Sequence, residues 1–299
     1  MSLPFISFED ADPLLDWKAL GAAFEAGHTR PKAEIADSFL YRDPDTLLNR
    51  AAWIDGLGLA VKSATVFPGR DPMINGAVSL FNDSSGAPEA ILDFHLVTKW
   101  KTAGDSAWAA SRLARPDSRN ILIVGAGTVG RSLVAAYRAW FPGARFSVWN
   151  RTPETAERFA RDLEIDVADA LADAVARADI VSSATMTTEP LIDGDWLRPG
   201  THVDLIGAYR PDMREANDAA LLRARVFVDS FDTTLGHIGE LKIPLEAGVI
   251  PREHVLADFY EGPFARGSDD EITLFKNGGG AHLDLMTSRY ILDAWRAAR

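Results

Sequence analysis

The pattern of apolar and polar positions divides the chain into three parts. Near the start, apolar residues recur at helical spacing over residues 9–27, which predicts an amphipathic helix. Between Ser38 and Phe94 the pattern changes to short alternating or apolar runs separated by turn residues. These runs predict an antiparallel sheet with strands at residues 46–54, 58–67, 76–81 and 90–94. A long helix is expected next, over residues 97–113.

From Asn120 onward the chain alternates between strand and helix patterns. The expected strands are residues 121–124, 146–149, 180–184, 201–206 and 225–229, and the clearest helices are residues 129–140 and 153–163. Alternation of this length predicts an α/β domain with a doubly wound parallel sheet. A last helix, at residues 281–298, is expected to return to the first domain. We therefore expect one domain at 1–118, completed by 272–299, and a second at 119–271.

Composition and charge narrow the range of partners. The 299 residues are 47% hydrophobic and carry a formal net charge of −12, which disfavours nucleic acid and anionic membranes as partners. The absence of cysteine excludes disulfides and cysteine-ligated metals, and the six histidines lack an HExxH spacing, so no metal site is expected. We expect no signal peptide, since residues 1–17 are acidic and lack a basic stretch, and no apolar run in the sequence reaches the length needed to span a bilayer. We expect a cytoplasmic protein.

The most specific motif is the run GAGTVG at residues 125–130, which directly follows a predicted strand and opens a predicted helix. In a dinucleotide-binding turn the first glycine makes the turn, the second lets the pyrophosphate approach, and the third lets helix and strand pack closely. The helix N-terminus then offers free N–H groups to the phosphates. The motif predicts a Rossmann domain that binds a nicotinamide dinucleotide. The expected cofactor-binding residues of this turn are Gly125, Gly127, Thr128, Val129 and Gly130.

The end of the next predicted strand bears on the choice of cofactor. An NAD site usually has an acidic residue there for the ribose 2′-hydroxyl. This chain instead has Asn150, Arg151 and Thr152. No carboxylate repels a 2′-phosphate, and a guanidinium and a hydroxyl are present to bind one. We therefore expect NADP(H), with NAD(H) as the alternative; a solvated Arg151 beside a helix cap is the other interpretation of the same residues.

Several further segments, in order along the chain, resemble the ornithine cyclodeaminase/mu-crystallin family, and its ketimine reductase branch in particular. They extend from about residue 46 to residue 295. The segments are 61–69, 98–103 with 106–107, 149–152 with 156 and 159–160, 185–190, 207–212 with 214–215, and 273–276 with Asp284. Each is modest evidence, but the ordered set is specific.

The resemblance implies an α+β domain for substrate binding and dimerisation, a Rossmann domain, a site in the cleft between them, and a homodimer. Members of the family transfer a hydride at the α-carbon of an amino or imino acid. The expected function is an NADPH-dependent reduction of a small anionic imino acid, such as pyrroline-2-carboxylate or piperideine-2-carboxylate. The alternatives are ornithine cyclodeamination, an alanine-dehydrogenase-like reaction, and a non-catalytic protein that binds NADPH or another ligand.

The resemblance also implies roles for individual residues near the substrate. Lys62 matches the family lysine that contacts the substrate carboxylate and handles a proton, although a surface lysine on an edge strand is the plain alternative. Lys101 occupies the position of a carboxylate-binding arginine, and a lysine offers a point charge instead of a planar fork. Thr102 matches a position that faces the cofactor or the site. The early substrate arginine of the family has no clean match; Lys32 or Arg50 is its candidate replacement, and a solvated cation is the alternative for either residue.

Further positions complete the expected site. Tyr209 replaces the aspartate of cyclodeaminases, which favours imine reduction over ring closure. Thr185 matches the family's cofactor-facing loop, and His237 is a candidate partner for the imine nitrogen or an ordinary loop histidine. Lys276 and the following glycine run, residues 278–280, are expected to form a structural or cofactor-adjacent turn. Trp100 is the one tryptophan next to the expected site.

Overall fold

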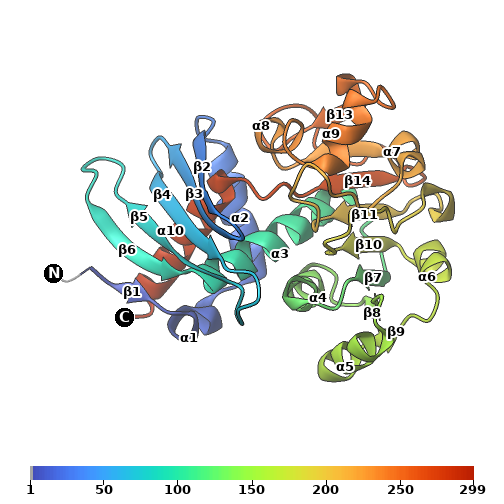
Figure 1. Ribbon diagram of the computed structural model, residues 1–299, viewed down its shortest axis with the longest axis horizontal. Helices are drawn as coiled ribbons and strands as arrows, with labels where there is room; N and C mark the ends of the chain where they lie inside the picture. Colours follow the sequence, from blue (N-terminus) through green and yellow to red (C-terminus); the bar gives the residue numbers. More distant parts are fainter. Residues whose placement is uncertain (1–2) are drawn as a thin grey trace. The chain divides into compact units, whose positions relative to one another are not determined.

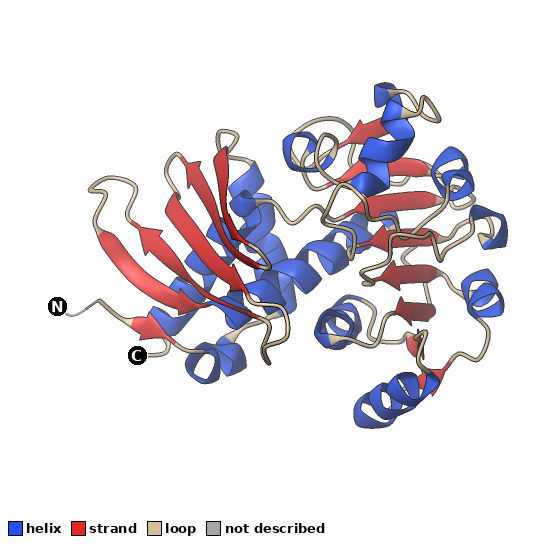
Figure 2. Cartoon of the chain, viewed as in Figure 1, coloured by secondary structure: helices blue, strands red, loops and turns tan. Residues whose placement is uncertain are grey.

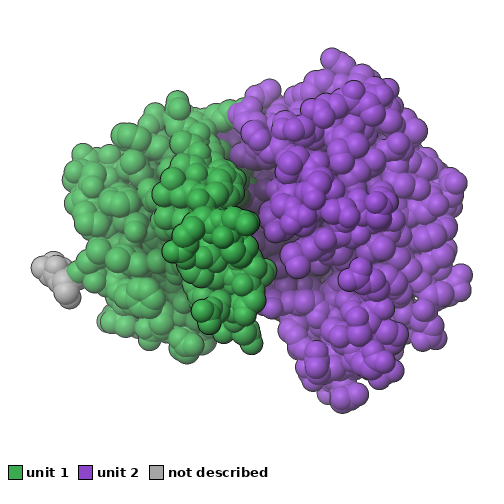
Figure 3. All heavy atoms as spheres, in the orientation of Figure 1, with its two compact units in different colours: residues 1–101, 280–299 green, residues 102–279 purple. Residues whose placement is uncertain are grey.

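The structure, a computed structural model, describes residues 3–299; the first two residues of the expected N-terminal domain lie outside the described part. The chain forms two compact units, which Figure 3 shows in different colours. Unit 1 comprises Met1–Lys101 and Gly280–Arg299, and unit 2 comprises Thr102–Gly279.

The core of unit 1 is a six-stranded sheet in the order β1-β6-β5-β4-β3-β2 (Figure 2). Strands β2 to β6 pair antiparallel with their neighbours, and β1 adds to β6 in parallel. The strands are β1 (Phe5–Ile6), β2 (Glu34–Arg42), β3 (Asp45–Ile54), β4 (Gly58–Val66), β5 (Ile74–Phe81) and β6 (Pro88–Asp93). Burial alternates along β4, so every second side chain faces the covered side of the sheet.

Helices cover one face of this sheet. The C-terminal helix α10 (Ala281–Ala297) contacts β3, β4 and β5 and packs on α2 (Trp17–His28). The N-terminal helix is not continuous: α1 (Phe8–Ala11) and the 3-10 turn η1 (Asp12–Leu14) precede α2. The chain breaks there because Pro13 lies in the first turn of η1 and the Asp16 carboxylate caps α2, accepting hydrogen bonds of 2.9 Å from two backbone N–H groups.

Unit 2 contains an eight-stranded, fully parallel sheet in the order β13-β12-β14-β11-β10-β7-β8-β9 (Figure 1). The strands are β7 (Asn120–Val124), β8 (Arg145–Trp149), β9 (Asp166–Val167), β10 (Ile180–Ser183), β11 (His202–Leu205), β12 (Arg225–Val228), β13 (Val255–Ala257) and β14 (Thr273–Lys276). The strand order reverses direction between β7 and β10. In doubly wound sheets this switch point is where ligands bind, at the carboxyl ends of the strands.

Helices lie on both faces of the second sheet. Apolar residues of α6, α7 and α9 join those of six strands in one continuous core. The second half of α3 packs against Phe227 and Phe275 on the other face, and α5 packs close to the glycine turn through Phe159. The helices of this unit are α4 (Thr128–Trp140), α5 (Pro153–Leu163), α6 (Leu171–Arg177), α7 (Asp218–Arg223), α8 (Phe231–Thr234) and α9 (Gly239–Glu246), with α3 (Phe94–Leu113) shared and 3-10 turns η2 (Gly194–Trp196) and η3 (Arg252–His254).

The predicted fold class is confirmed: a parallel α/β sheet and an antiparallel α+β unit to which the last helix returns. Several details differ. The prediction of a single helix at 9–27 was wrong, and strands β1, β2, β9 and β13 were missed. The strand β14 lies in the middle of the unit 2 sheet, between β11 and β12, whereas the sequence assigned residues 272–279 to the first domain. The unit boundaries at 101/102 and 279/280 accordingly differ from the expected 118/119 and 271/272.

Candidate functional site

The turn after β7 has the geometry that a dinucleotide requires. Gly125 has a φ of +108°, and a Cβ there would lie 2.7 Å from the Ala184 carbonyl oxygen. A Cβ on Gly130 would lie 2.4 Å from the Gly125 carbonyl oxygen, so helix α4 crosses the strand at a distance that only glycine allows. A Cβ on Gly127 would meet nothing within 4 Å, which leaves the space next to its backbone open. The three glycines thus have three different physical roles, as the motif predicts.

The first turn of α4 offers unsatisfied donors beside that open space. Gly127 is the N-cap of α4 and supplies no side-chain hydrogen bond to the helix. Thr128 is exposed and Val129 is half-buried at the start of the same helix. Because the first N–H groups of a helix lack intrahelical acceptors, this end suits a pyrophosphate.

The end of β8 lies against the glycine turn. The Asn150 side-chain oxygen accepts a hydrogen bond of 3.2 Å from the Ala126 N–H, and its amide donates to the Thr152 carbonyl at 3.1 Å. The side chain of Arg151 is exposed and makes no hydrogen bond or ion pair within the part of the chain that the structure describes. Thr152 caps α5 without a side-chain hydrogen bond. A guanidinium and a hydroxyl therefore remain available next to a turn that Asn150 fixes.

The buried carboxylate of Glu215 organises the carboxyl ends of β10 and β11. This residue had no role predicted from the sequence. One oxygen of Glu215 accepts hydrogen bonds from the Ser183 hydroxyl at 2.6 Å and from the N–H and hydroxyl of Thr185 at 2.7 and 2.8 Å. The other oxygen accepts from the Gly207 N–H at 2.6 Å. A Cβ on Gly207 would lie 1.8 Å from the Thr185 carbonyl oxygen, so the two loops touch through their backbones. Glu215 therefore holds the expected cofactor-facing loop in place.

A second buried carboxylate supports the first. Glu240, on α9, accepts hydrogen bonds from the N–H groups of Glu215 and Ala216 at 2.7 and 3.1 Å. Burial and the nearby Glu215 raise the pKa of Glu240 to about 7, and burial raises the pKa of Glu215. Lys276 is fully buried and donates to the carbonyls of Leu205 and Asn277 at 2.9 and 2.7 Å. Lys276 thus acts as a structural cation behind the strand ends.

A further polar network lies in the interior of unit 2. Asp204 accepts hydrogen bonds from the hydroxyls of Ser106, Tyr137 and Ser182 at 3.0, 3.0 and 2.6 Å. Burial raises the pKa of Asp204 to about 6. Asn277 links this network to α3, because its amide donates to Ser106 and to the backbone carbonyl of Thr102, which is half-buried.

In unit 1 the structure brings Lys62 and Lys101 together on one carboxylate. The Nζ atoms of Lys62, on β4, and of Lys101, on α3, lie 3.0 and 3.4 Å from the same oxygen of Asp284, on α10. All three residues are buried, with exposed fractions of 7%, 4% and 1%. The Lys62 ammonium also lies 4.7 Å from the centre of the Phe94 ring. Lys62 therefore lies on a central strand and not at a sheet edge.

The electrostatics of this lysine cluster, Lys62 with Lys101 and Asp284, follow from burial and from the like charges. Burial and the neighbouring Lys101 lower the pKa of Lys62 to about 8, against the opposing effect of Asp284. Burial alone would raise the pKa of Asp284, but the two lysines and Arg50 outweigh it and lower that pKa. Burial also lowers the pKa of His282, on α10, to about 3, so this imidazole is neutral at physiological pH.

The two candidate replacements for the early arginine differ in position. Arg50 pairs with Lys62 in the register of β3 and β4, and therefore lies on the same face of the sheet. Its guanidinium donates to Asp37 at 3.0 Å, so this charge is compensated across the strands. Lys32 is exposed, and its charge is one of those that lower the pKa of His282. Arg50 is therefore closer to the lysine cluster in the fold, although its guanidinium already has a carboxylate partner.

Three further expected site residues are Tyr209, His237 and Trp100. Tyr209 has an exposed fraction of 59%, and its ring centre lies 5.8 Å from the Arg210 guanidinium carbon. His237 is exposed, and its side chain makes no interaction with any described residue. Trp100 is buried; its indole donates to Asp12 at 2.8 Å and its ring stacks on Trp17 at 3.9 Å. Of these three, Trp100 has a packing role, and the other two side chains are open to solvent.

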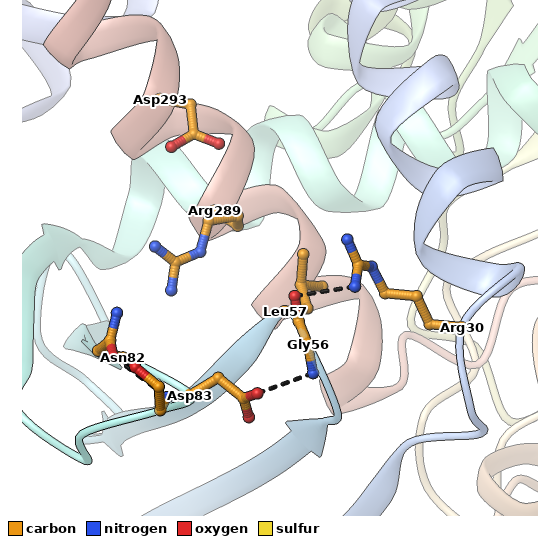
Figure 4. Close-up of a pocket in the computed structure, with 8 residues that line it drawn as sticks. Arg30, Gly56, Leu57, Asn82, Asp83, Arg289 and Asp293 are labelled. Carbon is orange, nitrogen blue, oxygen red and sulfur yellow. Dashed lines mark hydrogen bonds between the residues drawn. The ribbon is translucent and has the colours of Figure 1, made fainter.

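A surface pocket of about 460 Å³ in unit 1 has a different character (Figure 4). Its polar groups are engaged with one another: Arg30 donates to the Gly56 carbonyl at 2.8 Å, and Asp83 accepts from the Gly56 N–H at 2.8 Å. Arg289 lies 2.6 Å from Glu89. These contacts join the β3–β4 turn to Arg30 and to the β5–β6 turn, and α10 to β6; they provide no reactive group. Within residues 3–299 no three acidic or histidine side chains cluster to hold a metal ion, and no helix is long and apolar enough to cross a membrane.

Sequence reasoning missed the carboxylates. Glu215 and Asp284 were noted only as parts of matching segments, and Glu240 was not singled out. Nothing in the local pattern marks any of them as buried: Asp284 meets Lys62 across 222 positions of the chain. The one available signal was the motif context of Glu215 and Asp284.

Comparison with known proteins places the chain among enzymes. Residues 61–299 match the model of the ornithine cyclodeaminase/mu-crystallin family. The chain is 53% identical over 301 residues to Delta(1)-pyrroline-2-carboxylate reductase of Paracoccus denitrificans, covering 96% of this chain and 95% of that protein. It is 31% identical to ketimine reductase mu-crystallin of Rattus norvegicus, covering 81% and 77%. The fold is similar to that of Thermococcus litoralis Delta(1)-pyrroline-2-carboxylate reductase in complex with NADH and L-proline, with a TM-score of 0.88, 24% identity, and 99% and 98% coverage.

Proposed function

Because the chain belongs to the ornithine cyclodeaminase/mu-crystallin family, we propose that it is an oxidoreductase that reduces the C=N bond of a small cyclic imino acid. The substrate that we propose first is Δ1-pyrroline-2-carboxylate, with Δ1-piperideine-2-carboxylate as its larger analogue. The observation that carries this proposal is the 53% identity to a Δ1-pyrroline-2-carboxylate reductase over nearly the full length of both chains.

The glycine turn supports a nicotinamide dinucleotide as the hydride donor. The open space at Gly127 and the uncapped start of α4 fit a pyrophosphate, and the positive φ of Gly125 fits the turn. Glu215 fixes the neighbouring Thr185 loop, which we propose to face the nicotinamide end. When bound, the reduced nicotinamide supplies a hydride to the imine carbon.

The lysine cluster supports the role of the protein in the chemistry. We propose that the ammonium groups of Lys62 and Lys101 bind the substrate carboxylate and orient the imine. Reduction adds one hydride to the carbon and one proton to the nitrogen. The proton comes from the Lys62 ammonium, whose pKa near 8 suits proton transfer near neutrality, and water then restores it.

We further propose that the protein prefers NADPH to NADH. The free guanidinium of Arg151 and the uncommitted hydroxyl of Thr152 lie at the end of β8, the position where a ribose 2′-phosphate binds in such folds. No acidic residue stands at positions 150–152 to repel a phosphate.

We also propose a homodimer. The face of the first sheet opposite α10 carries large apolar side chains, and Leu40, Trp53 and Phe5 have exposed fractions of 65%, 46% and 57%. Light scattering of the purified protein at micromolar concentration tests this: a mass of twice 32.6 kDa supports it and a monomer contradicts it. A cytoplasmic location stays a prediction from the sequence.

The function is tested by oxidation of NADPH and NADH with a panel of substrates. We expect turnover with Δ1-pyrroline-2-carboxylate and formation of proline in equal amount. Absence of turnover with both cyclic imines would remove the assignment. Release of ammonia from ornithine would indicate cyclodeamination instead, and ammonia-dependent reduction of pyruvate would indicate an alanine dehydrogenase. Tight NADPH binding without any turnover would indicate a binding protein.

A further inference from the structure

The lysine cluster contains a carboxylate, Asp284, as well as the two ammonium groups of Lys62 and Lys101. Asp284 offers one oxygen to both lysines, at 3.0 and 3.4 Å, and its second oxygen is buried and has no hydrogen-bond partner. The three formal charges, two positive and one negative, leave a surplus of one positive charge. A surplus charge in a buried place is costly unless an anion joins it.

The charges around the cluster do not change this count. From β3, Arg50 faces Lys62, but Asp37 compensates its charge at 3.0 Å. From α10, His282 is neutral, since its pKa is lowered to about 3 by burial and by Lys101. From the segment before β2, Lys32 is solvent-exposed, and solvent screens its field.

We propose that Asp284 determines which substrate charge the lysine cluster selects. Because Asp284 neutralises one of the two lysines, the cluster binds a single carboxylate and disfavours dicarboxylates. This inference rests on the proposed function and deepens it. Asp284 does not touch the substrate; it acts by positioning Lys62 and Lys101 and by setting their net charge at +1.

The charge count gives an expectation for the wild type and for three variants. The cluster carries +1 in the wild type, +2 in Asp284→Asn, 0 in Lys101→Met, and +1 again in the double variant. The probes are pyrrole-2-carboxylate, a stable planar monoanion, and pyrrole-2,5-dicarboxylate, its dianion, measured by calorimetry on the NADPH-loaded protein. Each variant is first checked for folding by circular dichroism and thermal unfolding.

We expect the wild type to prefer the monoanion. Asp284→Asn should shift the ratio of the two affinities at least tenfold toward the dianion. Lys101→Met should weaken monoanion binding at least tenfold, and adding Asp284→Asn to it should restore part of that loss. An unchanged ratio in Asp284→Asn, or a double variant no better than Lys101→Met, would overturn the proposal.

A pH profile separates positioning from a merely structural role. Asp284→Asn removes the negative charge that raises the pKa of Lys62. The alkaline limb of the kcat/KM profile should therefore move to lower pH by about one pH unit or more, and one unit corresponds to about 1.4 kcal/mol. Asp284→Glu keeps the charge and should keep both the limb and the preference. Asp293→Asn, which removes a carboxylate farther along α10, is the matched control and should change neither. A limb that stays in place in Asp284→Asn contradicts the inference.

The test still gives a result if a variant does not fold or if the proposed function is wrong. If Asp284→Asn does not fold, Lys101→Met alone decides, because undiminished monoanion binding in that variant would contradict the charge count. If the wild type reduces no imine, the proposed function fails, but the binding ratios still test the cluster. Failure of the function and failure of the inference are therefore distinguishable.

Discussion

Gly127→Ala tests whether the turn after β7 holds a pyrophosphate. In the folded protein the added methyl group meets no atom within 4 Å, and the φ and ψ of −91° and −172° suit any residue. Alanine restricts the unfolded chain, which stabilises by about 0.4–1 kcal/mol, but it is a poorer N-cap than glycine by a similar amount. The free energy of unfolding should therefore change by less than about 1 kcal/mol.

Cofactor binding should respond very differently. The methyl group fills the space through which the pyrophosphate approaches the backbone, so we expect the Kd for NADPH to rise at least tenfold, about 1.4 kcal/mol or more. Gly130→Ala provides the contrast, because its Cβ would lie 2.4 Å from a backbone oxygen. That overpacking should destabilise the fold itself by about 1–3 kcal/mol.

The assay is titration with NADPH, followed by nicotinamide fluorescence, together with thermal unfolding of the apo-protein. We expect Gly127→Ala to keep the wild-type Tm within about 3 °C and to lose affinity, and Gly130→Ala to lower the Tm. A Gly127→Ala variant that binds NADPH as tightly as the wild type would refute the assignment of this turn.

Four further outcomes follow from the same geometry. Arg151→Ala should raise the KM for NADPH about tenfold or more and leave the KM for NADH within about twofold; equal changes for both would contradict a 2′-phosphate contact. Glu215→Gln should lower the Tm and weaken cofactor binding, because a carboxamide cannot accept every hydrogen bond that the carboxylate accepts; an unchanged Kd and Tm would contradict its role. Lys62→Met should lower kcat/KM by about 10²–10⁴, and in the wild type kcat/KM should fall as pH rises through about 8, where the Lys62 ammonium loses its proton. Because the folded-state pKa of Glu240 is raised from 4.5 to about 7, the folded state binds more protons between these values, so stability should decrease with rising pH there, and Glu240→Gln should flatten that slope in urea unfolding.

Local patterns predicted most of the fold. In unit 2, apolar runs predicted the strands β7, β8, β10, β11 and β12 and the helices α4 and α5, and the glycine turn lies where the motif predicts it. Strand β2 was missed because all but one of its residues are exposed, so no apolar alternation marks it. Strand β14 was recognised only as part of a family signature, and its insertion between β11 and β12 depends on a long-range pairing that no local pattern shows.

The sequence pointed to the two lysines of the lysine cluster and not to the buried carboxylates. Lys62 and Lys101 were selected by resemblance, and the structure brings both to Asp284. The charged partners of a buried group are set by tertiary packing, so neither Asp284 nor the Glu215–Glu240 pair could be assigned a role from its neighbours in the sequence. His237, by contrast, was a plausible choice by chemistry, but it is exposed and its side chain makes no hydrogen bond or ion pair with any described residue.

The most direct test of the account uses NADPH that carries deuterium at the transferable nicotinamide C4 position and follows where the deuterium goes. With Δ1-pyrroline-2-carboxylate as substrate, we expect mass spectrometry to find one deuterium on the α-carbon of the proline formed, in a single stereochemical configuration. Proline without deuterium, or no proline at all, would contradict the claim that this chain transfers a hydride to the carbon of an imino acid.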